Sequence, residues 1–136
     1  MIYLGLFCIL SLIISSCKTH DPFQGKWILH NINIAINNDF DYLEESQPGF
    51  IQERLLKILP EPVSNGGLIE FSKKENIIFN KTDTFNYRFG DPYLFIRESD
   101  MVYTLEYKVN SDTLMLMNKR DLGEAIWIFK KLKKEL

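Results

Sequence analysis

The sequence contains little cysteine and histidine, two residue types from which catalytic and metal sites are often built. Its 136 residues include two cysteines and two histidines. Cys8 lies inside an apolar N-terminal stretch and Cys17 ends that stretch, so the chain after Cys17 has no thiol. A domain folded from that part of the chain can have no intramolecular disulfide, no cysteine nucleophile and no thiolate metal site.

The motifs of common enzyme classes are also missing. The sequence has no glycine-rich phosphate loop, no closely spaced histidine pair and no nucleophile-elbow pattern. His30 falls in a predicted strand, and no spacing proposes the oriented partner that a catalytic group needs. We therefore expect His30 to be a rim residue, and we expect neither an enzyme nor a cofactor.

Clusters of positive charge are lacking too. The chain has 16 lysines and arginines and 18 acidic residues, which gives a net charge of −2. Positive and negative residues are interspersed along the sequence. Nucleic-acid-binding domains carry a basic patch, so we expect no nucleic-acid partner. Seven glycines and five prolines beside 13% aromatic residues indicate a packed domain and argue against disorder.

The N-terminal stretch has the pattern of an export signal. Residues 1–16 carry no charged side chain and end in small residues, after which the chain becomes polar at Lys18. The apolar run is shorter than the roughly 20 residues that a membrane-spanning helix needs. A short apolar core that ends in small residues is typical of a cleaved signal peptide.

Ile14-Ser15-Ser16-Cys17 resembles the lipobox of bacterial lipoproteins. The resemblance implies cleavage before Cys17, diacylglycerol on its sulfur and an acyl chain such as palmitate on its new amino group. Such an anchor is stable, because each buried methylene contributes about 0.8 kcal/mol. In the enterobacterial sorting rule, aspartate after the lipidated cysteine retains the protein at the inner membrane. Lys18 stands there, which implies the outer membrane in a Gram-negative cell. The alternative is an uncleaved anchor or an ordinary signal.

The expected domain organisation follows from these segments. Residues 1–16 form the signal peptide, 17–24 a lipidated tether and 25–132 one barrel domain with a single core.

Short apolar segments separated by polar turns dominate the chain from Gly66 onward. One more such segment ends at residue 32, where a polar stretch begins. They predict eight strands, over residues 23–32, 68–72, 77–79, 84–89, 93–97, 101–109, 113–117 and 125–129. Regular short strands are typical of an up-and-down antiparallel barrel or a sandwich. Closure is favoured because an open sheet would leave two exposed edges. We expect a mostly β fold, an eight-stranded antiparallel up-and-down barrel.

One amphipathic helix is expected over residues 47–59, between the first two strands. Its apolar side chains recur at helical spacing, namely Phe50, Ile51, Leu55, Ile58 and Leu59. Pro48 fits the first turn, and Pro60 and Pro62 end the helix. Residues 118–124 are expected to form a polar loop.

The acidic stretch from Asp39 to Glu45 only superficially resembles a calcium loop. Such a loop needs glycine at its sixth place and glutamate at its twelfth, where this chain has Glu44 and Phe50. We expect no metal site here and interpret the stretch as a solvated loop and helix N-terminus.

Gly25-Lys26-Trp27 resembles the Gly-x-Trp that opens the first strand of lipocalins. The closing part of the chain is similar to the lipocalin-like domains of bacterial lipoproteins, over residues 103–107, 112–116 and 129–132. The resemblance covers most of residues 23–132. It implies that Trp27 plugs one end of the barrel and stacks on a basic residue of the last strand, Lys130 or Lys131. The paired cysteines of many lipocalins are absent and the helical insertion is atypical, so the ligand type is not carried over.

Aromatic and methionine side chains on alternating strands could line an apolar pocket if they face inward. They are Tyr87, Phe89, Tyr93, Phe95, Tyr103, Tyr107, Met115 and Trp127, with Met117 beside them. Eight strands enclose room for packed side chains or for one small ligand. Two functions therefore stay open. The protein is a lipid-anchored barrel that binds a small hydrophobic ligand, or an accessory lipoprotein whose filled barrel contacts another envelope protein, foremost through helix 47–59.

Overall fold

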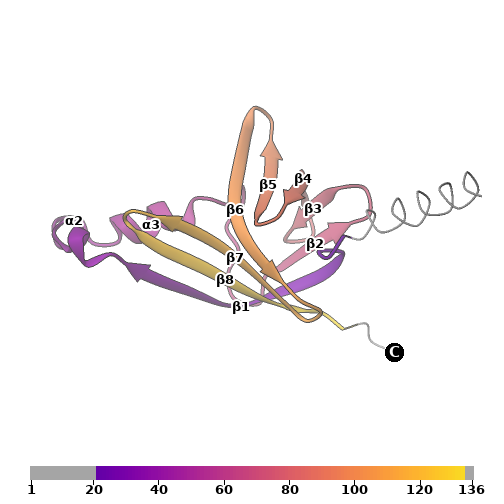
Figure 1. The fold of residues 1–136 in the computed structure, drawn as a ribbon, viewed down its shortest axis with the longest axis horizontal. Helices are drawn as coiled ribbons and strands as arrows, with labels where there is room; N and C mark the ends of the chain where they lie inside the picture. The colour runs from indigo at the N-terminus through magenta and orange to yellow at the C-terminus, as the bar shows by residue number, and fades with distance from the viewer. Residues whose placement is uncertain (1–20, 134–136) are drawn as a thin grey trace, which may run out of the picture.

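The structure is a computed structural model, and it describes residues 21–133. Eight strands form one closed barrel, in which each strand pairs antiparallel with the next and β8 pairs with β1 (Figure 1). This confirms the expected mostly β, up-and-down barrel. The strands are β1 Gly25–Ile36, β2 Leu68–Ser72, β3 Asn76–Phe79, β4 Asp83–Gly90, β5 Tyr93–Glu98, β6 Met101–Val109, β7 Thr113–Arg120 and β8 Gly123–Lys131.

The insertion between β1 and β2 differs from the single helix predicted over residues 47–59. It contains a 3-10 turn, η1 Asn38–Phe40, and two short helices, α2 Asp41–Ser46 and α3 Phe50–Leu56. The break falls at Gly49, whose φ of 84° is left-handed. Glu44 of α2 spans the break, because its carboxylate accepts the N–H groups of Gly49 at 2.8 Å and Ile51 at 3.4 Å. The acidic stretch thus holds the start of α3.

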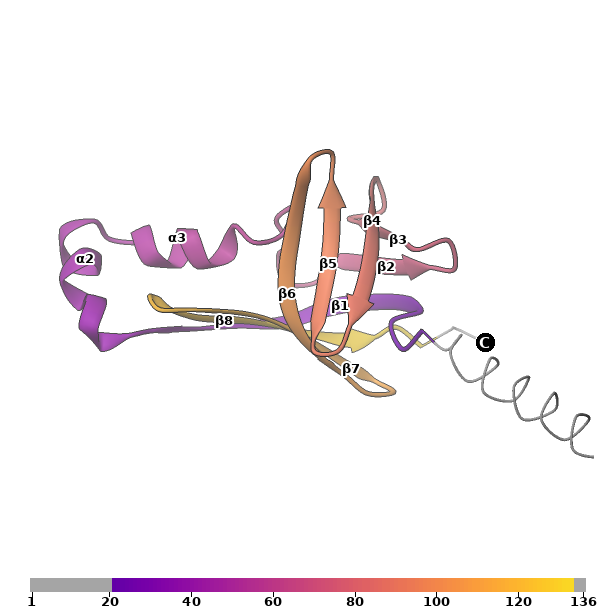
Figure 2. The same cartoon turned by 45° about the horizontal axis from the view of Figure 1, so that its top comes forward.

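Three strands, β1, β7 and β8, continue beyond the barrel as an extension of the same sheet. β1 pairs with β2 only as far as Ile28 but with β8 as far as Ile36. Similarly, β7 pairs with β6 up to Met117 but with β8 up to Arg120. We call this extension, residues 31–36, 118–120 and 123–126, the arm. It points away from β2 to β4, and α3 runs along one of its faces (Figures 1 and 2).

The arm corrects two predicted boundaries. The expected loop over residues 118–124 is a turn at Asp121 and Leu122 alone, because both flanking strands continue to it. The first strand also continues past Ile32, since Ile34 and Ile36 alternate with exposed polar or small residues. Both extensions keep the two-residue alternation of a half-buried sheet.

A β-bulge at His30 sets which side of β1 faces the core. The register with β8 shifts between Leu29 and Asn31. Trp27 and Leu29 are buried before the bulge, and Ile32 is the first inward residue after it. A bulge adds one residue and bends the strand, so it lets β1 leave the barrel while keeping isoleucines on its inner side. His30 itself is exposed.

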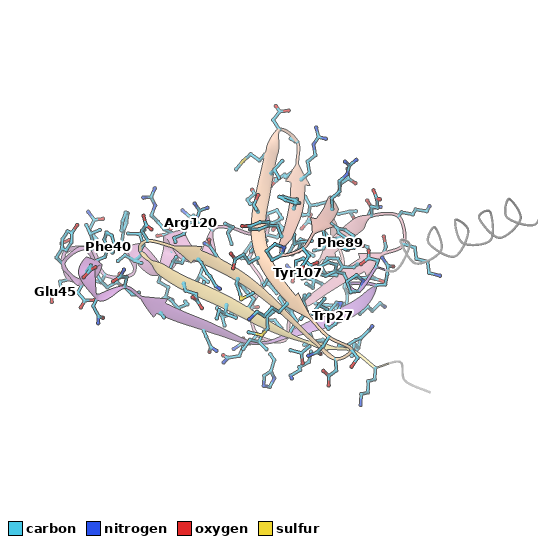
Figure 3. The ribbon with its side chains drawn as sticks, in the orientation of Figure 1. Trp27, Phe40, Glu45, Phe89, Tyr107 and Arg120 are labelled. Carbon is cyan, nitrogen blue, oxygen red and sulfur yellow. The ribbon has the colours of Figure 1, made fainter. Side chains whose placement is uncertain are left out.

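The core runs from the barrel into the arm without a break. α3 packs against β1, β7 and β8, and its Ile51 and Leu55 are at most 1% exposed. Figure 3 places Trp27 and Tyr107 at the barrel and Arg120 at the arm. Within residues 21–133, no helix combines the length and the apolar composition that crossing a membrane requires.

Candidate functional site

A cluster of aromatic rings fills the barrel interior at the end where the described chain begins. Its centre is Phe23, which precedes β1 and is fully buried. The ring of Phe23 lies between 4.7 and 6.2 Å, centroid to centroid, from those of Phe71, Tyr87, Phe89 and Tyr107. These separations are contact distances for aromatic rings. Side chains therefore occupy this end of the barrel.

Trp27 lies beside this cluster and is also fully buried. Its indole Nε1 donates a hydrogen bond of 2.8 Å to the carbonyl oxygen of Phe23. The Nζ of Lys131 lies 5.3 Å from the Trp27 ring centroid, within the range of a cation–π contact. Of the two lysines that the lipocalin resemblance proposed, Lys131 makes the contact, whereas Lys130 donates to Thr113 Oγ1 at 3.0 Å.

Tyr87 attaches the tether to the barrel. Its hydroxyl donates to the Asp21 carboxylate and accepts a hydrogen bond of 3.0 Å from Gln24 Nε2. The other oxygen of Asp21 accepts the N–H of Phe23 at 2.8 Å. Burial, and then the hydrogen bond to Asp21, raise the pKa of Tyr87 well above its ordinary value near 10. The hydroxyl is therefore a neutral structural donor, and it fixes Phe23 in place.

Five of the eight predicted pocket residues lie in the inward register. Tyr87, Tyr107 and Trp127 are buried, at 2%, 9% and 2% exposed. Phe89 reaches the ring cluster but is 39% exposed at the barrel rim. Tyr103 is half-buried closer to the β5–β6 turn. The structure therefore brings Tyr87, Phe89 and Tyr107 together around Phe23, and Tyr103 and Trp127 lie elsewhere along the interior.

The other three predicted residues face outward. Leu94 and Ile96 are fully buried, and side chains alternate along a strand, so Tyr93 and Phe95 lie on the outer surface. Their ring centroids are 6.3 Å apart there. Met115 lies in the same outward register on β7, between two buried leucines. These three residues do not line the barrel interior.

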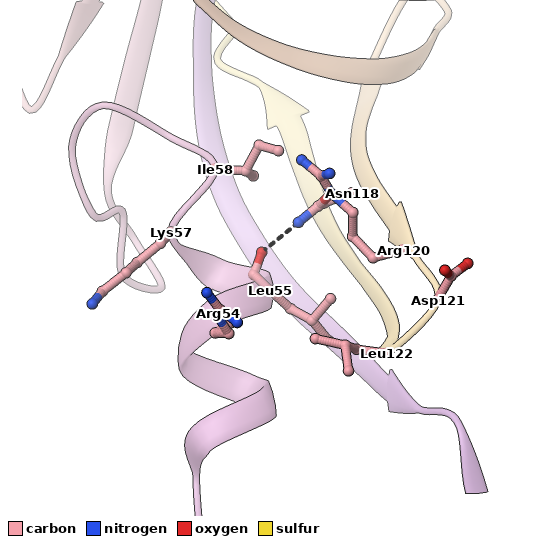
Figure 4. A pocket seen from close by; sticks show the side chains of 8 residues that line it. All are labelled: Arg54, Leu55, Lys57, Ile58, Asn118, Arg120, Asp121 and Leu122. Atoms are coloured by element: carbon pink, nitrogen blue, oxygen red, sulfur yellow. Dashed lines mark hydrogen bonds between the residues drawn. The ribbon is translucent and has the colours of Figure 1, made fainter. Parts of the chain in front are cut away.

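A cleft of about 440 Å³ lies between the end of α3 and the β7–β8 turn (Figure 4). We call it the α3–β7 cleft. Leucine and isoleucine side chains form its apolar part, and three cationic residues and one acidic residue surround it. The lining residues are Arg54, Leu55, Lys57, Ile58, Asn118, Arg120, Asp121 and Leu122.

Asn118 is the buried polar residue of this cleft, at 5% exposed. Its Nδ2 donates a 2.9 Å hydrogen bond to the carbonyl oxygen of Leu55. That carbonyl lies in the last turn of α3, where helices leave their C=O groups without partners. The Oδ1 of Asn118 accepts a 3.2 Å hydrogen bond from Nε of Arg120. One amide thus connects α3 to β7 and orients a guanidinium group.

The cations of the cleft have different partners. Lys57 pairs with Glu53 at 3.0 Å on the exposed side of α3. The guanidinium carbon of Arg54 lies 5.4 Å from the Phe50 ring centroid, and Arg120 is held by Asn118. Within residues 21–133, neither arginine forms an ion pair with an acidic residue. The carboxylate of Asp121 points away from the Arg120 guanidinium in Figure 4.

A second cleft, of about 320 Å³, lies where β6 and β7 diverge. It is lined by Tyr93, Thr104, Leu105, Glu106, Met117, Asn118, Lys119 and Arg120. The pairing of β6 with β7 ends here, at Glu106 and Met117. Lys119 Nζ lies 3.3 Å from the Glu106 carboxylate across the opening. Asn118 and Arg120 line both clefts, so the two clefts adjoin at the start of the arm.

Sequence reasoning missed the α3–β7 cleft because residues 118–124 were predicted to be a loop. The signal that could have found it is the alternation along β7. Leu114 and Leu116 are inward, and the same register continues to Asn118 and Arg120. A buried asparagine in that register marks a polar feature on an otherwise apolar face. Among the described residues, no group of three or more histidine, cysteine or acidic side chains could hold a metal ion.

Cys17, which is expected to carry the lipid, and the signal peptide of residues 1–16 lie outside the described residues. No protein-family model, curated protein or solved structure matches the chain.

Proposed function

We propose that this chain is a lipid-anchored bacterial lipoprotein of lipocalin-like fold that acts without catalysis. Its barrel core is filled, and the protein serves as an accessory module that contacts other molecules of the cell envelope through its outer surface. The observation that carries this proposal is the ring cluster around Phe23. A barrel used as a ligand cavity needs free interior volume, and these rings occupy one end of it.

The position of the tether supports an orientation at the membrane. Asp21 and Phe23 are fixed to the barrel, and four residue steps separate Asp21 from Cys17. A chain of that length spans at most about 14 Å. A lipid on Cys17 would hold the ring-cluster end near the bilayer, and the arm with α2 and α3 would point away from that end (Figure 1). Tyr42 of α2, 62% exposed, would lie on the presented surface.

A second function is binding of a hydrophobic ligand inside the barrel. The position of Phe23 in the chain favours it. This ring comes from the tether and not from a strand. It can therefore leave the barrel without breaking the hydrogen bonds between strands. Phe89 at the rim, 39% exposed, would then mark the entrance.

Uptake of an uncharged, environment-sensitive fluorescent fatty alcohol distinguishes the two functions. The full chain in nanodiscs of zwitterionic lipid is titrated with the probe, and empty nanodiscs provide the background. A filled barrel predicts no saturable uptake by the wild type, but uptake by Phe23→Ala, which removes the central ring and leaves a cavity. Leu132→Ala, at an exposed apolar position, serves as the control and should behave like the wild type. Saturable uptake by the wild type would replace the first function with the second.

A further inference from the structure

The α3–β7 cleft combines features that small-ligand sites share. Its volume of about 440 Å³ lies within the range of roughly 300–1,000 Å³ that such sites occupy. It is lined by apolar side chains and by a few oriented polar groups. It lies outside the barrel interior, so it does not depend on whether the barrel is filled or on the lipid anchor.

The charged part of the cleft selects an anion. Arg54 and Arg120 approach it from α3 and from β7, and neutral groups, the Phe50 ring and the Asn118 amide, hold them. Their positive charge is therefore not neutralised by a direct ion pair with an acidic residue of the described chain. Arg120 donates through Nε to Asn118, and its two terminal nitrogens have no hydrogen-bond partner within residues 21–133, so they can donate to an anion. A guanidinium group matches the geometry of a carboxylate or phosphate.

The apolar part of the cleft favours a ligand that also carries an alkyl chain. Leu55 and Ile58 are 1% and 9% exposed, so they form the floor, and half-buried Leu122 lies opposite on the β7–β8 turn. Burying a ligand methylene against such side chains contributes about 0.8 kcal/mol. A purely polar anion would leave this surface unused.

We propose that the α3–β7 cleft binds a small amphipathic anion, with a carboxylate or phosphate ester at one end and a short alkyl chain at the other. Arg120 and Arg54 bind the head, and Leu55, Ile58 and Leu122 contact the chain. Asn118 is a positioning residue, because it joins α3 to β7 and orients Arg120. Free fatty acids and the headgroup region of anionic lipids both supply this chemistry.

Isothermal titration with a matched ligand series tests the site. The full chain in zwitterionic nanodiscs is titrated with octanoate, octanol, octylamine and acetate, and the heats of empty nanodiscs are subtracted. We expect saturable binding of octanoate, and at least tenfold weaker binding of the other three, since each lacks either the anion or the chain. Equal binding of octanol and octanoate would overturn the proposal.

Variants that remove a single positive charge test whether octanoate binds in the cleft. Arg120→Gln removes the charge and the guanidinium fork of this exposed side chain but leaves a polar one, and it should weaken octanoate binding about tenfold. Lys108→Gln removes an exposed cation from the outer face of β6 and should leave binding unchanged. Octanoate binding that Arg120→Gln does not weaken would assign the anion to another part of the surface and overturn the proposal.

Competition separates the two sources of the ligand. If anionic lipid supplies it, nanodiscs with phosphatidylglycerol should weaken octanoate binding to the wild type. If phosphatidylglycerol leaves octanoate binding unchanged and this binding still depends on Arg120, the ligand of the cleft is a free amphipathic anion. Uptake of the uncharged fluorescent fatty alcohol by Phe23→Ala should not depend on Arg120, so failure of this site is distinguishable from failure of the filled-barrel function.

Discussion

At the scale of single residues, two glycines with positive φ stand where the chain approaches itself closely. At Gly25, with φ at +124°, an added Cβ would lie 3.1 Å from Cε of Lys131, whose Nζ lies over Trp27. At Gly123, with φ at +153°, it would lie 2.3 Å from the carbonyl oxygen of Ala35. The first contact involves a flexible side chain, and the second involves backbone. Gly123 is therefore the stricter requirement.

Gly123→Ala should lower the free energy of unfolding by about 2–4 kcal/mol, because it combines backbone strain with a clash between β8 and β1. Urea denaturation followed by circular dichroism measures the change. Gly90→Ala is the matched control, since no described heavy atom outside residues 89–91 lies within 4 Å of the added Cβ. A loss no larger in Gly123→Ala than in the control would contradict the close approach of the two strands.

Tyr87 links the stability of the protein to pH. Its pKa is raised in the folded state by burial and by the hydrogen bond to Asp21. Below pH 10 the tyrosine is neutral in both states, and its contribution is complete. As the pH rises above 10, the unfolded chain loses this proton while the folded one retains it, so stability falls with pH.

Tyr87→Phe should lower stability at pH 7 by about 1–2 kcal/mol, because it leaves Asp21 and Gln24 without the hydroxyl. It should also make the loss of stability between pH 9.5 and 11.5 less steep. The remaining slope includes Tyr107, whose pKa burial raises, and Tyr103, whose pKa the hydrogen bond from its hydroxyl to Glu98 raises. Denaturation curves across this pH range test both effects. An alkaline slope identical to that of the wild type would contradict the assigned role.

At the scale of elements, the attachment of α3 to the arm depends on one buried amide. Asn118→Leu leaves the Leu55 carbonyl without its donor and frees Arg120. It should lower the free energy of unfolding by about 1–3 kcal/mol. Hydrogen exchange should become faster in α3 and stay unchanged in β2 to β5. Asn86→Leu, at an exposed position of β4, is the control. Uniformly faster exchange across the barrel would argue against a local attachment.

The strands show what the sequence could and could not determine. β4 alternates aromatic with polar residues, so its inward face, with Phe85, Tyr87 and Phe89, was predictable. β5 is apolar on both faces, and period alone cannot tell whether Leu94 or Tyr93 faces the core. Packing against neighbouring strands decides the question, and it places Tyr93 outside. β7 has the same ambiguity around Met115.

The helical insertion and the arm were predicted less well, for two physical reasons. The apolar spacing of residues 50–59 indicates one helix, and α3 covers only its first part, Phe50–Leu56. The acidic stretch before it was expected to be a loop but contains α2, which Gly49 separates from α3 and which the Glu44 carboxylate links to the start of α3. The polar residues of the β7–β8 turn suggest a loop. Pairing with β1 and coverage by α3 instead stabilise the strands up to Arg120 and from Gly123.

At the scale of the whole molecule, the proposed anchor and the fold place two different surfaces at opposite ends. The ring cluster lies where the tether enters, and the arm carries α3 and the cleft (Figure 1). Cys17→Ala should abolish incorporation of labelled palmitate and move the protein from the membrane fraction to the soluble fraction of the envelope. Lys18→Ala, next to it, should leave acylation unchanged. Membrane retention with no incorporated label in the wild type would contradict the lipid anchor.

Intact mass spectrometry of the protein extracted from its membrane tests the central claim most directly, because one sample reports both the anchor and the barrel. Under denaturing conditions, we predict the mass of residues 17–136 with a diacylglyceryl group and an acyl chain added. Under native conditions we predict no further stoichiometric adduct in Arg120→Gln, in which anion binding in the α3–β7 cleft is weakened. An unmodified mass that still includes residues 1–16, or a bound hydrophobic molecule that this variant retains, would contradict a lipid-anchored protein with a filled barrel.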